Sequence, residues 1–146
     1  MSSPKQLLPL SKQDFAYIAG LIDGEGTVTL TRKHKKENRQ LCISISSTEK
    51  CLLEFVLRAT GVGKITNKKT GKPNHAASFA YAVYNRQALS LLENVEPFLK
   101  SYKRKRARLI LSDYLKFTPR NGKYNDGLLV RKHCFEENVL AIKANS

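Results

Sequence analysis

The hydrophobic pattern changes from a helical period to a strand period within a few residues, in the segment from residue 11 to residue 31. Ser11 followed by Asp14 resembles a capping box, and apolar side chains then recur at helical spacing: Phe15, Ile18, Leu21 and Ile22. Beyond two closely spaced glycines, "GTVTLTRK" alternates Val28 and Leu30 with threonines, as a half-buried strand does. The sequence therefore predicts a helix over about 11 to 23 that runs almost directly into a strand.

The same two periods recur along the rest of the chain. Alternation predicts a second strand over about 39 to 46, after the polar hairpin tip "KHKKENR", and two more strands in "GKITNKK" and "ASFAYAVY". Helical spacing predicts four further helices. The first is opened by a capping box of Ser46 and Glu49 and ended by Gly61, and its apolar stripe is Leu52, Phe55, Val56 and Ala59. The other three are predicted over 85–95, about 101–117 and 128–144.

This order, αββαββα plus one or two helices, predicts an α+β fold with a four-stranded antiparallel sheet and helices packed on one face. We expect all 146 residues to form a single domain, with a core over about 11–117 and a C-terminal loop and helix over 118–146.

The second face of the predicted sheet is polar. Its hydroxyl and lysine side chains come from all but the last strand: Thr27, Thr29, Thr31, Lys33, Ser44, Ser46, Lys64, Thr66 and Lys68. One interpretation is a face that is simply solvated, because antiparallel sheets often have one wet face. The orientation of the last strand stays open: either Ser78 and Ala80 or Phe79 and Tyr81 lie on the polar side.

The charge of the chain favours a nucleic-acid partner for that face. There are 26 Lys and Arg against 12 Asp and Glu, a net charge of +14. A membrane surface would require a basic amphipathic helix with a bulky apolar face, whereas a DNA duplex is matched by basic and hydroxyl groups on elements that follow a groove about 12 Å wide. We predict these DNA-contacting residues: Thr27, Thr29, Thr31, Arg32, Lys33, Lys35, Arg39, Ser44, Ser46, Lys64, Thr66, Lys68, Lys69 and Ser78.

Two further patterns concern the compartment. No apolar run approaches the length of a membrane span, and the N-terminal residues lack the apolar segment of a signal peptide. The three cysteines, Cys42, Cys51 and Cys134, show no metal-ligand spacing and are typical of a reducing compartment. We therefore expect an intracellular protein without a membrane partner.

Asp23-Gly24-Glu25-Gly26 places two acids at the predicted C-terminal end of the first helix. Anions are unfavourable there by about 0.3–1 kcal/mol, because the last carbonyls of a helix carry partial negative charge. A Mg²⁺ ion held by the Glu25 carboxylate and the Gly24 carbonyl would offset that cost, since Mg²⁺ prefers hard oxygen ligands. The alternative is that these four residues form only a turn.

Lys103 differs from the rest of the basic run "KSYKRKRAR". A run of basic residues in a helix usually forms only a solvated face. However, Lys103 begins a helix whose apolar stripe includes Ala107 and Ile110, so we expect its side chain to lean toward the body of the domain.

Residues 18–26, "IAGLIDGEG", closely resemble the signature of the LAGLIDADG homing endonucleases, with Ile for the first Leu and Gly-Glu for Ala-Asp. The predicted element order is also similar to that family's, so the resemblance covers about residues 11 to 117. Only one copy of the motif is present.

The resemblance implies a homodimer, as in single-motif members. The two motif helices would pack across a two-fold axis, with Ala19 and Gly20 permitting close contact, and would bring both copies of Glu25 together over the DNA minor groove. It further implies an intron-encoded, Mg²⁺-dependent endonuclease with a saddle-shaped sheet, which makes double-strand breaks with short 3′ overhangs in a long, approximately palindromic target. The expected compartment is an organelle (chloroplast or mitochondrion) or an archaeal cytoplasm.

The resemblance also assigns roles to residues. Glu25 matches the family's metal-binding acid, Gly24 its carbonyl ligand, and Asp23 the first acid of the motif, which has a mainly structural part at the interface. Lys103 matches the basic residue that polarises the attacking water or stabilises developing charge. Ser47 stands where the family often has Gln at the catalytic centre, and Lys50 is an alternative candidate for part of that role.

Rival interpretations of the function are a noncatalytic nucleic-acid binder, an intron-splicing maturase that binds RNA with the same surfaces, and a generic basic ribosome-associated protein. The last explains the charge but not the motif. Glu25 and Lys103 favour cleavage, because a chain that only binds nucleic acid has no physical need for an acid at a helix end.

Overall fold

The computed structural model describes residues 5–32, 34, 38–68, 77–119 and 123–145. Within these residues the chain forms α1 (Lys12–Glu25), β1 (Gly26–Thr31), β2 (Gln40–Ser47), α2 (Lys50–Thr60), β3 (Lys64–Lys68), β4 (Ser78–Tyr84), α3 (Asn85–Val95), the 3-10 turn η1 (Glu96–Phe98), α4 (Tyr102–Asp113), the 3-10 turn η2 (Tyr114–Phe117) and α5 (Asp126–Ala141). The predicted αββαββα order is confirmed, from α1 to α3, with α4 and α5 as the two additional helices.

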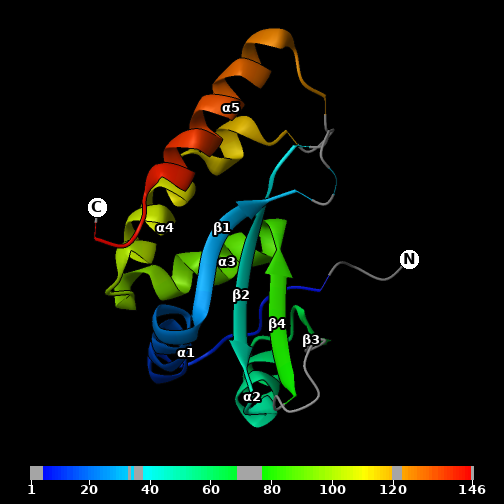
Figure 1. Cartoon of the computed structure of the whole chain (residues 1–146), viewed down its shortest axis with the longest axis vertical. Helices are drawn as coiled ribbons and strands as arrows, with labels where there is room; N and C mark the ends of the chain where they lie inside the picture. Colours follow the sequence, from blue (N-terminus) through cyan, green and yellow to red (C-terminus); the bar gives the residue numbers. More distant parts are fainter. Residues whose placement is uncertain (1–4, 33, 35–37, 69–76, 120–122, 146) are drawn as a thin grey trace.

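The four strands form one sheet in the order β1-β2-β4-β3, and every neighbouring pair is antiparallel. One row of the register crosses the whole sheet: Thr27 opposes Ser44, Ser44 opposes Ala82, and Ala82 opposes Lys64. Figure 1 shows the strands curving in front of α3, with α1 and α2 at their lower end. The face turned away from these helices is therefore open.

The inner face of the sheet is apolar, as the alternation predicts. Its central side chains, such as Ile43, Ile45 and Tyr81, are at most 1% exposed and pack against α1, α2 and α3. Each large aliphatic side chain buried in this way contributes about 1.5–3 kcal/mol to folding. The sheet and the three helices on its inner face therefore share one core, whose further members include Ala107 and Ile110 of α4 and Phe135 and Val139 of α5.

Ala19 belongs to this core, so the prediction that it lies in a seam with a second copy is wrong. The Ala19 side chain is 0% exposed, whereas Gly20 is exposed. The reason is helical spacing: Ala19 follows Phe15 by four residues and precedes Ile22 by three, so it shares their inner face.

The predicted start of α2 is also wrong. Ser46 continues β2 opposite Ala80, and α2 begins only at Lys50, with Glu49 as N-cap. Because Ser46 and Ser47 are both held in the ladder, the turn comes after Ser47, whose Oγ accepts a hydrogen bond from the Glu49 N–H at 2.9 Å. The buried stripe of α2 is accordingly Leu53, Val56 and Thr60, of which only Val56 was predicted.

Candidate functional site

The C-terminal end of α1 and the N-terminal end of α4 cap each other. The Asp23 carboxylate accepts hydrogen bonds from the Lys100 N–H at 2.8 Å, the Ser101 N–H at 3.1 Å and the Ser101 hydroxyl at 2.5 Å. In return, the Lys103 ammonium donates to the carbonyls of Ile22 and Asp23, both at 2.8 Å. We call this arrangement the helix-end junction. Each helix end thereby gains the opposite charge that its orphan groups favour.

Both charged groups of the junction have shifted pKa values. Burial raises the pKa of Asp23, but the hydrogen bonds from Ser101 and from the Lys100 and Ser101 main chain outweigh it, and the net pKa lies below 3.8. Lys103 is 8% exposed, in line with its expected lean toward the domain body. Burial lowers the Lys103 pKa below 10.5, against the opposing effect of the Asp23 and Glu25 charges. The junction thus holds a desolvated ammonium that the Glu25 carboxylate influences.

Glu25 is the last residue of α1 and is exposed, as is Gly24. The Gly24 carbonyl lies in the final turn, where a helix leaves its carbonyls without intrahelical donors. Gly26 fixes the position of this end, since a Cβ there would lie 2.7 Å from the Ser44 carbonyl oxygen and 2.9 Å from the Ile22 Cα. Only glycine lets the helix end approach β2 so closely, and the approach places Glu25 at the margin of the sheet.

These oxygens fit Mg²⁺ as part of a shared site. Mg²⁺ is usually held by one or two carboxylates together with substrate phosphates and waters. Glu25 and the Gly24 carbonyl supply hard oxygens of this kind. Within the described ranges no group of three or more His, Cys, Asp or Glu residues gathers that would hold a metal ion unaided. The Glu25 carboxylate and the Gly24 carbonyl would by themselves supply only part of the coordination sphere of Mg²⁺.

The register settles which side chains share the open face. Thr27, Thr29 and Thr31 oppose Ser44, Cys42 and Gln40 respectively, and the Thr27 and Ser44 hydroxyls are 2.8 Å apart. On the other side Ser78 opposes Lys68, and Ala80 opposes Thr66. We call this set the polar face: Thr27, Thr29, Thr31, Gln40, Cys42, Ser44, Ser46, Lys64, Thr66, Lys68, Ser78, Ala80, Ala82 and Tyr84.

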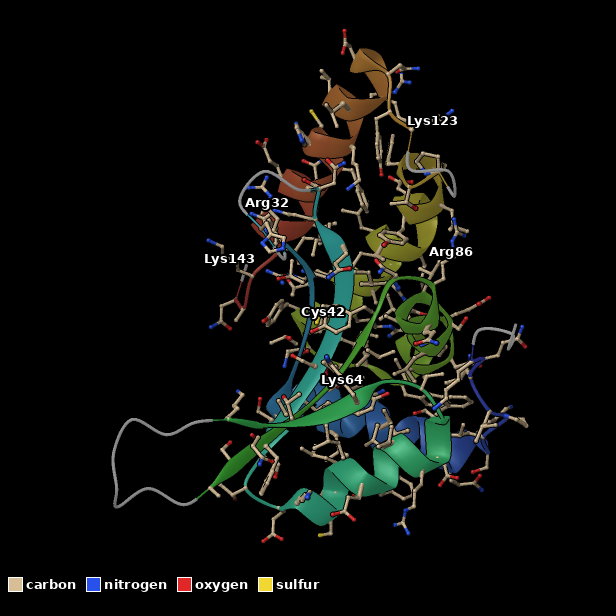
Figure 2. All side chains as sticks on the ribbon, turned by 90° about the vertical axis from the view of Figure 1, so that its right-hand side faces the viewer. Arg32, Cys42, Lys64, Arg86, Lys123 and Lys143 are labelled. Atoms are coloured by element: carbon tan, nitrogen blue, oxygen red, sulfur yellow. The ribbon has the colours of Figure 1, made fainter. Side chains whose placement is uncertain are left out.

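The open question about β4 is thereby answered. Tyr81 is 0% exposed and Phe79 packs against the core, so Ser78 and Ala80 lie on the polar face. In Figure 2 the sheet is seen from one edge, with the labelled Arg32 and Lys64 toward the side of the polar face and Arg86 of α3 on the opposite side.

Sequence reasoning missed Gln40 and Tyr84 on this face. Gln40 accepts a hydrogen bond from Asn85 Nδ2 at 3.0 Å. Tyr84 opposes Cys42, and burial raises the pKa of both the Cys42 thiol and the Tyr84 hydroxyl. The alternation of β2 already contained Gln40, two residues before Cys42, whereas placing Tyr84 required the register of β4.

Other predicted contact residues lie off the polar face or beyond the described residues. Arg32 is exposed just after β1, but Arg39 is half-buried and its guanidinium donates to the Leu30 carbonyl at 3.1 Å. Lys33, Lys35 and Lys69 fall outside the residues that the structure describes.

Ser47 and Lys50 are both placed at the end of the sheet that carries the motif, because the β1–β2 ladder begins there with Gly26 opposite Ile45. Ser47 has the inward parity of Ile45, and its hydroxyl is engaged by Glu49. Lys50 is exposed, with its Nζ 5.3 Å from the centre of the Phe79 ring.

Several basic side chains of α4 form hydrogen bonds and ion pairs within the chain. Arg104 and Arg108 both donate to Glu96, at 3.2 and 2.9 Å. Arg106 donates to the carbonyls of Val28 and Ile142 at 3.0 and 2.7 Å. The run therefore joins α4 to neighbouring elements and is not simply a solvated face.

No helix in the described part of the chain has both the length and the apolar character needed to cross a membrane.

Comparisons with known proteins agree with this fold. Residues 12–103 match the family model of the LAGLIDADG-like domain. The structure of the homing endonuclease I-CvuI in complex with its target in the presence of Ca has 19% sequence identity, covers 92% of this chain and 85% of that chain, and gives a TM-score of 0.71. A second structure of the same endonuclease, with another target and Mg and with the DNA not cleaved, gives a TM-score of 0.72 at 19% identity, again over 92% of this chain and 85% of that chain.

The archaeal intron-encoded homing endonuclease I-Vdi141I, complexed with DNA, gives a TM-score of 0.61 at 17% identity, over 92% of this chain and 86% of that chain. No curated protein sequence matches. At these identities the structural likeness shows the fold, and the family model covers more than half of the chain. From the motif at the end of α1, the four-stranded sheet and the family match, the chain belongs to the family of the LAGLIDADG-like domain.

Proposed function

We propose that this chain is a homodimeric, Mg²⁺-dependent, site-specific DNA endonuclease that makes double-strand breaks in a long, approximately palindromic target. The observation that carries the proposal is the exposed Glu25 carboxylate at the margin of the polar face, beside the buried ammonium of Lys103. That pairing places an acid that can hold a cation next to a surface suited to DNA. The matched endonuclease structures, solved with DNA and with Ca or Mg, support the same function.

The polar face supports DNA recognition by its dimensions and chemistry. Its hydroxyls donate and accept hydrogen bonds, and Lys64 and Lys68 add positive charge along β3. Strands rise about 3.3 Å per residue, so β1 and β2 are long enough to follow several base pairs along a groove. Lysine contacts to phosphates supply affinity, and contacts to base edges supply specificity.

The outer face of α1 supports a symmetric dimer. Tyr17 is 47% exposed, and Gly20 and Gly24 lie three and seven residues further on along the same face. A Cβ added to Gly20 or Gly24 would meet nothing within 4 Å. Since glycine in a helix costs about 1 kcal/mol relative to alanine, and nothing inside the chain demands it, we infer that a second α1 approaches here. A two-fold axis then brings the two Glu25 carboxylates together.

In this scheme the helix-end junction positions the catalytic groups. Asp23 orients α4 so that Lys103 is held at the end of α1, where its ammonium stabilises negative charge developing on the scissile phosphate. Glu25 and the Gly24 carbonyl would hold Mg²⁺, which would supply activation of water and stabilisation of the leaving oxygen. Two carboxylates at one axis would repel each other, and bound cations would offset that repulsion.

The test is cleavage selection from a randomised DNA library by the purified chain, with Mg²⁺ and in parallel with Ca²⁺. We expect cut DNA only with Mg²⁺, enriched in a long site with approximate two-fold symmetry. Binding without cleavage under both conditions would indicate a noncatalytic binder, and a cleaved site without symmetry would contradict the homodimer.

A further inference from the structure

Strand β2 extends beyond its neighbour β4 at the hairpin end of the sheet. The β2–β4 ladder ends where Cys42 opposes Tyr84, whereas β2 begins at Gln40 and the described chain continues back to Asn38. Main-chain groups of a strand alternate sides, so Arg39 and Leu41 direct theirs to the same side. On that side β4 is no longer present to pair with them.

Side chains from the C-terminal part of the chain take the place of β4. The Tyr114 hydroxyl of η2 accepts a hydrogen bond from the Leu41 N–H at 3.4 Å and donates to Asn85 Oδ1 at 3.2 Å. At Arg39, two residues before Leu41, Glu136 Oε2 accepts a hydrogen bond from the main-chain N–H at 3.3 Å, and the Lys132 ammonium donates one to the main-chain carbonyl at 3.0 Å. Both main-chain groups of Arg39 are thus held by α5.

The two α5 residues form a buried ion pair. Lys132 and Glu136 are one helical turn apart, their charged atoms lie 2.8 Å from each other, and they are 2% and 3% exposed. The Tyr124 ring lies over the Lys132 ammonium at 5.8 Å. Buried ion pairs are often no more stabilising than well-packed apolar side chains of similar volume. Stability alone therefore does not explain why these two charged residues are buried here. Their two hydrogen bonds to the main chain of Arg39 do explain it.

We propose that Lys132 and Glu136 are positioning residues that fix the course of the chain at Arg39 and Gln40, where β2 begins, and so determine sequence recognition at one end of each half-site. This inference rests on the proposed DNA endonuclease function. It concerns the hairpin end of the polar face, where Thr31 opposes Gln40, five residues along the ladder from Gly26. That separation is about 17 Å at the strand rise, so the pair acts on recognition and leaves the junction at Glu25 and Lys103 unchanged.

The experiment compares the full-length chain with the double variant Lys132→Met/Glu136→Leu, which keeps the volume and removes both hydrogen bonds to Arg39. Each protein is put through cleavage selection on a randomised library, and its single-turnover rate on saturating target is measured. We expect about tenfold weaker base discrimination at one set of positions, since a well-made base contact is worth about that factor or more. The single-turnover rate should stay within about twofold of wild type.

Two single variants identify the positions. Thr31→Ala marks the base pairs read at the hairpin end, and Thr66→Ala marks those read from β3. The double variant should relax the Thr31 positions and spare the Thr66 positions. Glu137→Gln, an exposed change on the same helix, should alter neither set.

A thermal melt of the double variant accompanies the selection, and Tyr114→Phe provides a milder second variant that acts on the Leu41 N–H. If the double variant does not fold, relaxation of the Thr31 positions by Tyr114→Phe supports the proposal, and an unchanged profile for Tyr114→Phe overturns it. A folded double variant with an unchanged profile, or with equal loss at both sets, overturns it as well. Failure of the wild-type chain to cleave any DNA would refute the proposed function instead.

Discussion

At the scale of single residues, Lys103 and Asp23 link two helix ends that lie about 80 residues apart in the chain. The Lys103 ammonium is held by two carbonyls of α1, and the Asp23 carboxylate is held by the N–H groups of Lys100 and Ser101, just before α4. Asp23 therefore has little capacity left for a metal ion, and Glu25, which is exposed, is the acid available for one. The two acids are only two residues apart in the motif, but the structure engages Asp23 in hydrogen bonds with the segment before α4 and leaves Glu25 exposed.

Replacing Lys103 with Met should slow single-turnover DNA cleavage by at least about 100-fold, because the developing negative charge loses its nearest ammonium. DNA affinity, measured by fluorescence anisotropy, should stay within about threefold. Lys100→Met is the matched control, since its exposed side chain lies three residues away and only its main chain joins the junction. A wild-type rate for Lys103→Met would remove this residue from the proposed mechanism.

Replacing Asp23 with Asn should lower the free energy of unfolding by about 2 kcal/mol at neutral pH, the usual loss for hydrogen bonds to a charged group. The folded pKa of Asp23 lies below its unfolded value of 3.8. Its contribution is therefore fully present above that value and is lost as the pH falls through the folded pKa.

Chemical denaturation of both proteins across pH 2–7 measures this difference. The gap between wild type and Asp23→Asn should close in the acidic part of the range, and Glu137→Gln serves as an exposed control. A gap that is independent of pH would show that the carboxylate charge is not what stabilises the junction.

At the scale of elements, α1 has two faces with different uses. Its inner face, which includes Ala19, is part of the core. Its outer face carries an exposed tyrosine and two glycines that nothing in the chain crowds. An amphipathic surface helix would normally place charged or polar residues there, so the composition of this face favours a second helix as its partner.

Replacing Gly20 with Leu should convert the proposed dimer to a monomer while leaving the chain folded, because a Cβ at this position meets nothing within 4 Å and the new side chain would block close approach of a second α1. Sedimentation equilibrium should change from twice the chain mass to the chain mass, and cleavage should disappear with it. Ser90→Leu, at an exposed position of α3, should remain dimeric. A dimeric Gly20→Leu protein would place the dimer interface elsewhere.

The sequence predicted the elements whose signals are local. The periods of α1, β1 and β2 identified both faces of the first two strands, and the limits of α3 were predicted as Asn85 to Val95. The start of α2 was missed because Ser46 is held by pairing with Ala80 in a strand more than 30 residues away. The hydrogen bonds between α5 and Arg39 join residues more than 90 positions apart in the chain, and no local sequence pattern predicts such a contact.

At the scale of the whole molecule, the net charge of +14 is divided between two uses. Arg104, Arg106 and Arg108 are engaged by a carboxylate and by carbonyls inside the chain. Lys64 and Lys68, in contrast, are exposed on the polar face. Composition therefore predicted an anionic partner, but only the fold shows which cations are exposed on the polar face and which are engaged within the chain. Two copies related by a two-fold axis would join two such faces into one long surface.

The most direct test of this account is cleavage of a plasmid carrying the selected site by wild type and by Glu25→Gln, with DNA binding measured in parallel. The account predicts that wild type linearises the plasmid in Mg²⁺, and that Glu25→Gln leaves it uncut while binding the site within about threefold of wild type. Linearisation by Glu25→Gln at the wild-type rate would contradict the account, because the exposed acid at the end of α1 would then have no part in the chemistry.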